Sequence, residues 1–441
     1  MKWSLHGWLL SNKYLSISNS ALFALHFSYS SKSCMNKKRF NDRCISMPRE
    51  LAKGNNLRLA RYRKAPELGP KILFFSGGTA LRRFAEVLTN YTHNSIHLVT
   101  PFDSGGSSAE LRRAFSMPAV GDLRARLLAL ADDSVTGHPE VAALFSHRLV
   151  AQGRKKGEET AMLTQRLKAL VSAKHPLLKA IAEPMRSLIQ SYIAVFYQHM
   201  PKDFNLNGAS VGNLILTGGY LIHDRSLDPI AFLFGQLIKT RGTVRTTTDA
   251  DLQLAVLLEN GRTINGQHRF TGKETAEIDS PIKAIKLSGE ADDIDTLDAS
   301  KVCKETRTLI NSAELVVFPP GSFYSSIIAN LLPKGVDQAL AKNPSPKVYV
   351  PSLGTDLETL GMTLVDQVRV LNEHLSSSLQ TRSSIDFLLF DSQLLSVSAQ
   401  QIETIRNEMC IQVIDVDLAP VSADSHRYDD VKLAEALLGL T

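Results

Sequence analysis

The residues best suited to chemistry follow an apolar run at 96–99 and read Asp-Ser-Gly-Gly-Ser-Ser, from Asp103 to Ser108. Hydroxyl groups, glycine amides and nearby guanidinium groups together favour phosphate oxygens as partners. A carboxylate beside phosphates can also hold Mg²⁺, since hard cations bridge oxygen ligands. A solvated turn is the alternative interpretation. The phosphate hypothesis predicts a site made of Asp103, which is the candidate catalytic and metal-binding carboxylate, with Gly105, Gly106, Ser107, Ser108 and Arg112.

A glycine pair lies earlier in the chain, where Gly77-Gly78-Thr79 follows the apolar run Ile72 to Phe75. Backbone N–H groups at a glycine turn and at a helix N-terminus can bind an anion. The turn lacks the third glycine of the GxGxxG fingerprint, and the chain contains no GxxxxGK[ST] loop. An NAD(P) dehydrogenase and a P-loop nucleotidase are therefore disfavoured. A tight turn that needs glycine for its backbone conformation explains the pair equally well.

Two more turns resemble these. Gly121-Asp122-Leu123-Arg124 opens a helical pattern, in which Asp122 either caps the helix or contacts a ligand. Pro320-Gly321-Ser322 follows the apolar run 315–318 and also precedes a helix. Strand-to-helix turns of a parallel sheet face one rim, where ligands bind. We therefore predict that Gly321 and Ser322 help to cradle phosphates, and that Arg112 or Arg124 offsets their charge.

These turns need a parallel sheet to bring them together. Bounded apolar runs at 72–75, 96–99, 315–318, 347–350, 387–390 and 410–414 predict its strands. The expected fold is α/β, with a doubly wound, mostly parallel Rossmann-like sheet. Polar-faced runs at 242–245, 252–258, 267–270 and 282–287, with the hairpin signal Asn260-Gly261, predict a small antiparallel β flap over 240–290. Residues 134–205 predict a helical insertion, with breaks near 153–157, at Pro176 and at Pro184.

The charge is unevenly distributed along the 441 residues. Residues 1–70 hold 13 Lys or Arg against 3 Asp or Glu, whereas the whole chain has a net charge of +6, so the remainder is near −4. The basic balance thus gives no reason to expect that the folded body binds nucleic acid. Residues 1–46 are expected to be a disordered or mis-assigned N-terminal extension. Residues 47–437 are expected to form a single domain.

Other sequence features limit the environment of the protein. No apolar run is as long as a membrane-spanning helix, so no membrane partner is expected. The four cysteines include no CxxC pair and suit a reducing cytoplasm, which is the predicted location. No HExxH or GxSxG motif occurs. The chemistry of this chain must therefore be sought in its glycine and hydroxyl turns.

In combination, these motifs resemble the CofD-like superfamily, which includes 2-phospho-L-lactate transferase and the YvcK-type gluconeogenesis factors. The resemblance covers about residues 70–437 and is closest to the CofD-like protein of the bacterial GAK gene system. The segments that carry it are Asp103 to Arg113, Gly121 to Asp132, Ser210 to Leu214, Arg241-Gly242 with Thr248-Asp249, Pro320 to Ile328, Pro346 to Val350 and His426 to Leu437. The first turn departs from the pattern, since it reads SGGTA where many relatives carry GGGTG. The loop 352–361 and the helical segment near 150–205 also differ from those of the relatives.

The resemblance implies a nucleotide-binding transferase. It would move a phosphorylated small acid, or a related group, from a nucleoside-diphosphate-activated donor to an acceptor hydroxyl, with Mg²⁺ as cofactor. The alternative is a non-catalytic regulator of YvcK type that binds a UDP-sugar. The implied nucleotide-binding residues are the turn residues named above together with Asn213. The expected partners are a nucleotide or a nucleotide-activated small molecule, with a homodimer as the candidate assembly.

Overall fold

The computed structural model describes residues 56–77, 81–134, 137–151, 156–272, 278–289, 300–376, 384–420 and 426–441. The prediction for residues 1–46 lies outside these ranges. So do the predicted site residues Gly78 and Thr79.

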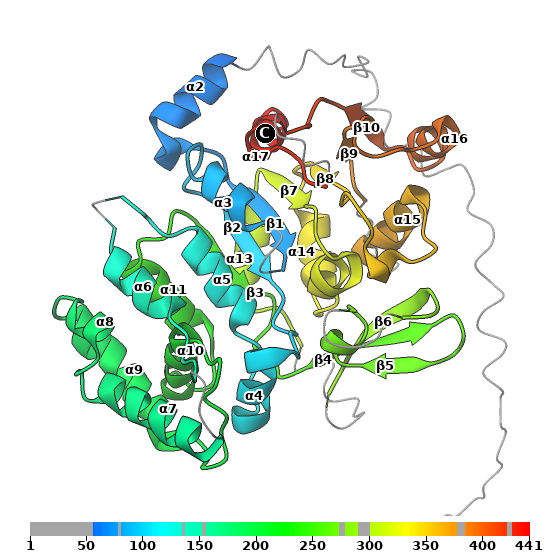
Figure 1. Ribbon diagram of the computed structural model, residues 1–441. Coiled ribbons are helices and arrows are strands. Elements are labelled where there is room, and N and C mark those ends of the chain that lie inside the picture. Colours follow the sequence, from blue (N-terminus) through cyan, green and yellow to red (C-terminus); the bar gives the residue numbers. More distant parts are fainter. Residues whose placement is uncertain are drawn as a thin grey trace, which may run out of the picture. The chain divides into compact units, whose positions relative to one another are not determined.

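The main sheet has seven parallel strands in the order β10-β9-β8-β7-β1-β2-β3 (Figure 1). Along the chain, the strand order runs outward from β1 to β3 and then restarts at β7 on the other side of β1. This reversal defines a doubly wound sheet with a topological switch point between β1 and β7. The predicted α/β fold is confirmed. The strands are β1 (Ile72–Ser76), β2 (Ile96–Val99), β3 (Thr243–Thr246), β7 (Leu315–Phe318), β8 (Lys347–Tyr349), β9 (Phe387–Phe390) and β10 (Gln412–Asp415).

Both faces of this sheet are covered, which explains why its strands are almost continuously apolar. Successive side chains of β1 point to opposite faces. Ile72 and Phe74 pack into one core with α3 (Arg82–Leu88) and α17 (Asp430–Leu438). Leu73 and Phe75 belong to the core on the other face, where the Phe75 ring stacks on Phe318 with 5.4 Å between ring centroids.

Helices connect the strands on both faces. Those that follow β2 and precede β3 begin with α4 (Gly106–Phe115) and α5 (Gly121–Ala129). After β7 the chain makes a π-helical turn, η4 (Phe323–Ile327), and a 3₁₀ turn, η5 (Ile328–Leu331). The remaining helices and turns are α2 (Asn56–Lys64), η2 (Pro66–Leu68), α13 (Lys304–Ser312), α14 (Val336–Lys342), η6 (Leu357–Thr359), α15 (Leu364–Leu375), α16 (Ala399–Glu403) and η7 (Thr404–Glu408).

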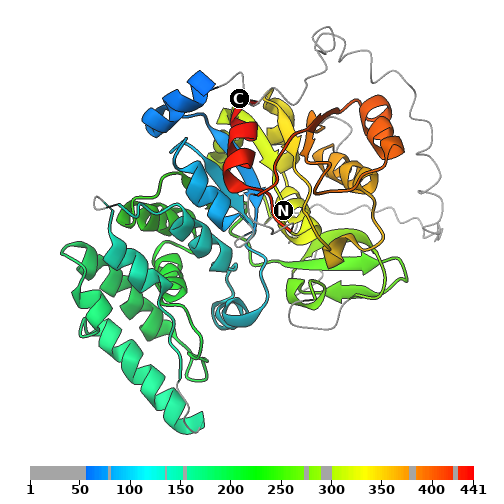
Figure 2. The same cartoon turned by 45° about the horizontal axis from the view of Figure 1, so that its top comes forward.

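The helices of the predicted insertion pack together in a core that they share with α4, α5 and β3. It contains α6 (Pro139–Ser146), α7 (Lys156–Val171), α8 (Pro176–Lys179) and α9 (Met185–His199), followed by α10 (Val211–Ile222) and α11 (Asp228–Leu237). The predicted breaks at Pro176 and Pro184 both coincide with helix starts, because proline is tolerated in a first turn. Figures 1 and 2 show this group, coloured cyan to green, apart from the flap.

The flap is a three-stranded antiparallel sheet, but it is smaller than predicted. It contains β4 (Gln253–Leu258), β5 (Thr263–Asn265) and β6 (Ile282–Ser288), in the order β5-β4-β6. The hairpin signal at Asn260-Gly261 is confirmed, since Gly261 lies between β4 and β5 with φ at 83°. The two antiparallel pairings of β4 hold this small sheet together.

Two parts of the flap prediction are wrong. The segment 242–245 belongs to β3, which pairs in parallel with β2 at the edge of the main sheet. Its alternating exposure is that of a half-covered edge strand, which has the same polar-faced pattern as a flap strand. The segment 267–270 is a 3₁₀ turn, η3 (Gln267–Arg269), because Gly266 with φ at 93° turns the chain out of the strand. Among the described residues, no helix is both long and apolar enough to span a bilayer.

Candidate functional site

Residues from three separate turns meet at the switch point of the sheet, where doubly wound proteins have a crevice outside the strand ends. Gly77, at the end of β1, faces Ser326 of η4 so closely that an added Cβ would lie 2.6 Å from the Ser326 Oγ. The same Cβ position is 3.5 Å from Oδ2 of Asp122, in the first turn of α5. Thr100, which follows β2, donates its hydroxyl to that oxygen at 3.4 Å. Glycine at position 77 therefore lets the end of β1 pack closely against Ser326, next to the carboxylate of Asp122.

Asp103 and Ser108 meet at Gly121, the first residue of α5. A Cβ on Gly121 would lie 3.0 Å from the Ser108 Oγ and 3.7 Å from Oδ2 of Asp103. The other oxygen of Asp103 accepts a hydrogen bond from the Gly105 N–H at 3.1 Å, which fixes the carboxylate. Asp103, Ser108 and Asp122 thus converge on one part of the rim, as the sequence predicts. Asp122 does not cap α5, because the N-cap residue is Val120.

The start of α4 follows Asp103 directly. Gly105 is its N-cap, and Gly106 adopts φ of 48°, a left-handed conformation that favours glycine. Ser107 is half-buried and Ser108 is buried. Because the first N–H groups of a helix lack partners within it, this end of α4 presents donors and positive dipole next to Asp103.

Arg126 of α5 holds the first turn in place, a role that was not predicted. It is fully buried and donates to the carbonyl of Gly77 at 2.9 Å and to that of Leu81 at 2.8 Å. Burial lowers the pKa of Arg126 to about 10, and the carboxylate of Asp122 opposes that shift. At neutral pH Arg126 therefore remains a cation beneath the turn.

Asn330 of η5 supports the same turn from the other side of the switch point. Its side-chain amide is buried and donates to the carbonyl of Ser76 at 3.2 Å and to that of Ser326 at 2.7 Å. The β1 turn and the β7 turn are therefore tied to each other through one residue. A buried amide in a predicted helix gives no sequence signal for this contact.

Arg124 and Asn213 form a buried pair on the helical side of the crevice. The Arg124 Nε donates to Oδ1 of Asn213, on α10, at 2.8 Å. Burial, and then the positive charges of Arg148 and Arg82, lower the pKa of Arg124 to about 10. Gly212 allows this packing, since a Cβ there would lie 2.7 Å from the Arg124 side chain. The two predicted residues are thus brought together, with Asn213 orienting the guanidinium.

Arg112 was predicted to offset the charge of phosphates, but in the structure it binds residues at the start of the flap. Its guanidinium binds Oδ1 of Asp251, with the Nη2 distance at 2.8 Å, and donates to the carbonyl of Leu252 at 2.7 Å. These contacts anchor the chain where it enters the flap. The flap is also joined to the Asp103 loop, because Ser104 Oγ and Nδ1 of His268 are 2.8 Å apart. Arg112 therefore positions the flap in this structure.

The third turn, Pro320 to Phe323, is filled by side chains from the loop after β8. The N–H of Gly321 donates to Ser352 Oγ at 2.8 Å, and that hydroxyl donates back to the Gly321 carbonyl at 2.8 Å. The N–H of Phe323 donates to Oδ2 of Asp356 at 2.9 Å. The carbonyl of Ser322 accepts hydrogen bonds within η4. Ser352 and Asp356 were not predicted as site residues.

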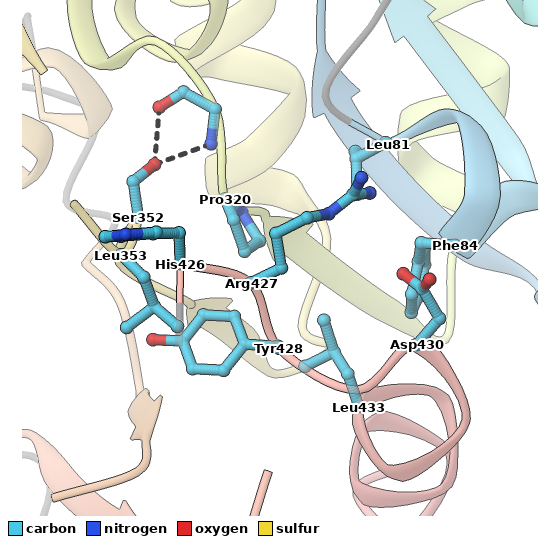
Figure 3. A pocket seen from close by; sticks show the side chains of 11 residues that line it. Leu81, Phe84, Pro320, Ser352, Leu353, His426, Arg427, Tyr428, Asp430 and Leu433 are labelled. Atoms are coloured by element: carbon cyan, nitrogen blue, oxygen red, sulfur yellow. Dashed lines mark hydrogen bonds between the residues drawn. The ribbon is translucent and has the colours of Figure 1, made fainter. Parts of the chain in front are cut away.

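A cavity of about 390 Å³ opens beside this turn (Figure 3). Its apolar wall is formed by Leu81, Phe84, Leu353 and Leu433. Its polar lining is formed by Gly321, Ser352, His426, Arg427 and Asp430. Tyr428 closes one side and donates to the carbonyl of Pro351 at 3.0 Å. The cavity therefore lies at the ends of β1, β7 and β8, next to the first turn.

One other group could be considered for a metal. Oxygen or sulfur atoms of Asp228, Cys303 and Glu305 lie within 4.8 Å of one another. Arg245 forms an ion pair with Asp228, so the negative charge of this group is already partly neutralised. Among the described residues no set of three such ligands surrounds Asp103.

The geometry defines a doubly wound α/β protein whose turns bring Asp103, Ser108 and Asp122 together at its switch point. The chain belongs to the CofD family: the model of that family, described as 2-phospho-L-lactate transferase CofD, matches residues 72–433. The predicted resemblance is confirmed.

Curated relatives cover most of this chain. The gluconeogenesis factor of Bacillus subtilis (strain 168) is 27% identical over 384 residues, which are 84% of this chain and 98% of the relative. A putative gluconeogenesis factor of Thermoanaerobacterium thermosulfurigenes is 28% identical over 382 residues, covering 84% of this chain and 97% of the relative. A crystal structure of a UPF0052 family protein from Bacillus halodurans has a TM-score of 0.60 at 21% identity, covering 84% of this chain and 99% of that one. That structural likeness supports the fold.

Proposed function

We propose that this protein binds the diphosphate of a nucleotide-activated donor in the crevice and transfers a phosphorus-containing group to an acceptor hydroxyl. The observation that carries the proposal is the convergence of Asp103, Ser108 and Asp122 around the closely packed glycines Gly77 and Gly121. Ligands of doubly wound proteins bind at the switch point. The family of the chain supports the same class of reaction.

The protein's own groups would act by positioning and charge. The amides at the start of α4, with Ser107 and Ser108, would bind phosphate oxygens. The acceptor oxygen would bond to the phosphorus as the phosphoanhydride bond to the nucleotide breaks, and the nucleotide would leave as its monophosphate. Asp103 would orient the acceptor hydroxyl and receive its proton. Arg124 and Arg126 would supply positive charge from beneath the site.

The carboxylates of the crevice fit Mg²⁺. This ion is usually held by one or two carboxylates together with substrate phosphates. Asp103 and Asp122 are the two carboxylates that lie beside Gly121 and Gly77, respectively. When bound, Mg²⁺ would neutralise charge on the phosphate oxygens.

A non-catalytic regulator that binds a UDP-sugar is the second candidate. Two observations favour it. The relatives described above are named gluconeogenesis factors rather than transferases. The amides of the third turn already have side-chain partners, so they would not stabilise a reacting phosphoryl group.

Binding and turnover measured on the same preparation separate these candidates. Calorimetric titration with UDP, GDP and UDP-sugars shows whether a nucleotide binds in the crevice. Transfer is tested by measuring the release of nucleotide from activated donors, with and without Mg²⁺. Binding together with Mg²⁺-dependent release supports the transferase. Binding without release for any donor and acceptor supports the regulator. If no nucleotide binds, both candidates fail. The cytoplasmic location, the link to the GAK system and a homodimer remain predictions.

A further inference from the structure

The loop after β8 supplies oxygen partners for three backbone N–H groups of the third turn and of η4, which follows it. Ser352 Oγ accepts from the Gly321 N–H, Oδ2 of Asp356 accepts from the Phe323 N–H, and Oε2 of Glu358 accepts from the Ser325 N–H at 2.7 Å. An unpaired N–H group at such a turn is what binds a phosphate oxygen. Here those groups are already paired within the chain.

The two carboxylates are built into the fold. Glu358 is only 2% exposed and also accepts the hydroxyl hydrogen of Ser325 at 2.5 Å. The second oxygen of Asp356 accepts from the Glu358 N–H at 3.0 Å and so caps the turn η6. Asp356 therefore makes contacts on both sides, with its own loop and with the β7 turn, whereas both oxygens of Glu358 accept from Ser325.

We propose that Asp356 and Glu358 are specificity-determining residues, which fill the third turn with internal carboxylates so that the crevice accepts a diphosphate but no further anionic group at the end of β7. The inference rests on the proposed function, because it concerns the ligand of the same crevice. It assigns Gly321 to the wall of the cavity and removes Gly321 and Ser322 from phosphate binding.

The neighbouring cavity is lined by one cationic and one anionic side chain, those of Arg427 and Asp430. Figure 3 shows the Arg427 side chain extending across the cavity, with Asp430 on the side of Phe84. A third phosphate would meet Asp356 and Glu358 without a free amide to compensate for repulsion. The part of the ligand that lies beside the third turn therefore carries no further phosphate.

The test compares GDP with GTP and UDP with UTP by calorimetric titration of the whole protein, in the presence of a chelator. The wild type should bind each diphosphate at least about tenfold more tightly than its triphosphate. Asp356→Ala frees the Phe323 N–H and removes a charge, so triphosphate affinity should rise about tenfold while diphosphate affinity stays within about threefold. Asp356→Asn, which keeps an acceptor for that N–H, should give a smaller gain. Glu403→Gln on the exposed α16 is the matched control and should change neither affinity.

Several outcomes would overturn the inference. One is a wild type that binds a triphosphate as tightly as its diphosphate. Another is a folded Asp356→Ala variant whose triphosphate affinity is unchanged. If that variant does not fold, Ser322→Ala decides, because a loss of diphosphate affinity equal to that of Ser108→Ala would show that the third turn binds phosphate. A wild type that binds neither nucleotide class instead contradicts the proposed function.

Discussion

The guanidinium of Arg126 lies 2.9 Å from the carbonyl oxygen of Gly77, although the two residues belong to different βα units. Gly77 ends β1, whereas Arg126 is on α5, which follows β2. The contact therefore couples the first glycine turn to the helix that carries Asp122 and Arg124. It fixes the position of Gly77, the residue that follows β1.

Replacing Arg126 with Met should destabilise the protein by about 1–3 kcal/mol, because it removes the guanidinium donors to the carbonyls of Gly77 and Leu81. Arg126→Lys should lose less, since one donor and the charge remain. Urea denaturation gives the free energy of unfolding of both variants. Arg113→Ala, which removes an exposed arginine, is the control and should leave the unfolding curve nearly unchanged. An Arg126→Met protein as stable as the wild type would contradict the role of this clamp.

Asp103→Asn should reduce metal-dependent turnover by at least about tenfold, which corresponds to about 1.4 kcal/mol in the barrier. The substitution keeps the size of the side chain but removes the charge that orients the acceptor and binds Mg²⁺. Nucleotide affinity without metal should stay the same or rise, because a negative charge near the phosphates has gone. Initial rates and calorimetric affinities check the two parts. Asp203→Asn, on the exposed surface, is the control and should leave turnover unchanged. If Asp103→Asn also leaves turnover unchanged, Asp103 has no part in the mechanism.

Gly77→Ala should lower nucleotide affinity by about tenfold or more, because the new methyl group fills the space beside Asp122. It should also cost about 1–3 kcal/mol of stability through the contact with Ser326. Adding Ser326→Ala should restore much of the stability but not the affinity. Thermal unfolding and titration of both proteins separate these effects. Wild-type affinity in Gly77→Ala would place the phosphates elsewhere.

The stability of the protein should fall as pH rises from about 4.5 to 7 because of Glu358. Burial, and then the charge of Asp356, raise the pKa of Glu358 from 4.5 to about 7. Glu373 also faces this region, on the other side of Tyr324. The folded state keeps the Glu358 proton to a higher pH than the unfolded state. The contribution of Glu358 to stability is therefore fully present below its pKa in the unfolded state and is lost as the pH rises through its pKa in the folded state. The loss is on the order of 3 kcal/mol and is complete above pH 7.

Glu358→Gln should remove this part of the pH dependence, since the amide does not titrate. Urea unfolding of both proteins at several pH values between 4.5 and 8 gives the difference directly. Subtracting the two curves cancels the contributions of the other buried acids, including Asp249 and Asp430. Parallel curves for the two proteins would show that Glu358 has the same pKa in the folded and unfolded states.

The amino-acid sequence by itself determined the parallel sheet and the grouping of its turns. Strands such as Ile72–Ser76 and Leu315–Phe318 are buried on both faces, so each is a continuous apolar run with a glycine turn after it. Because parallel strands end at one rim, the clustering of Gly77, Asp103 and Asp122 could be predicted from their positions alone. Edge strand β3 was misassigned, because its partly exposed face has the pattern of a flap strand.

Only the tertiary structure decided which polar groups face a ligand and which are used within the fold. Arg112 pairs with Asp251, the third turn pairs with Ser352 and Asp356, and Arg126 reaches back to Gly77. Each contact joins residues more than 30 positions apart in the sequence. The same residue types would bind phosphate or one another with similar chemistry, so their spacing along the chain cannot select the partner. The distances between donors and acceptors in the folded chain make that selection.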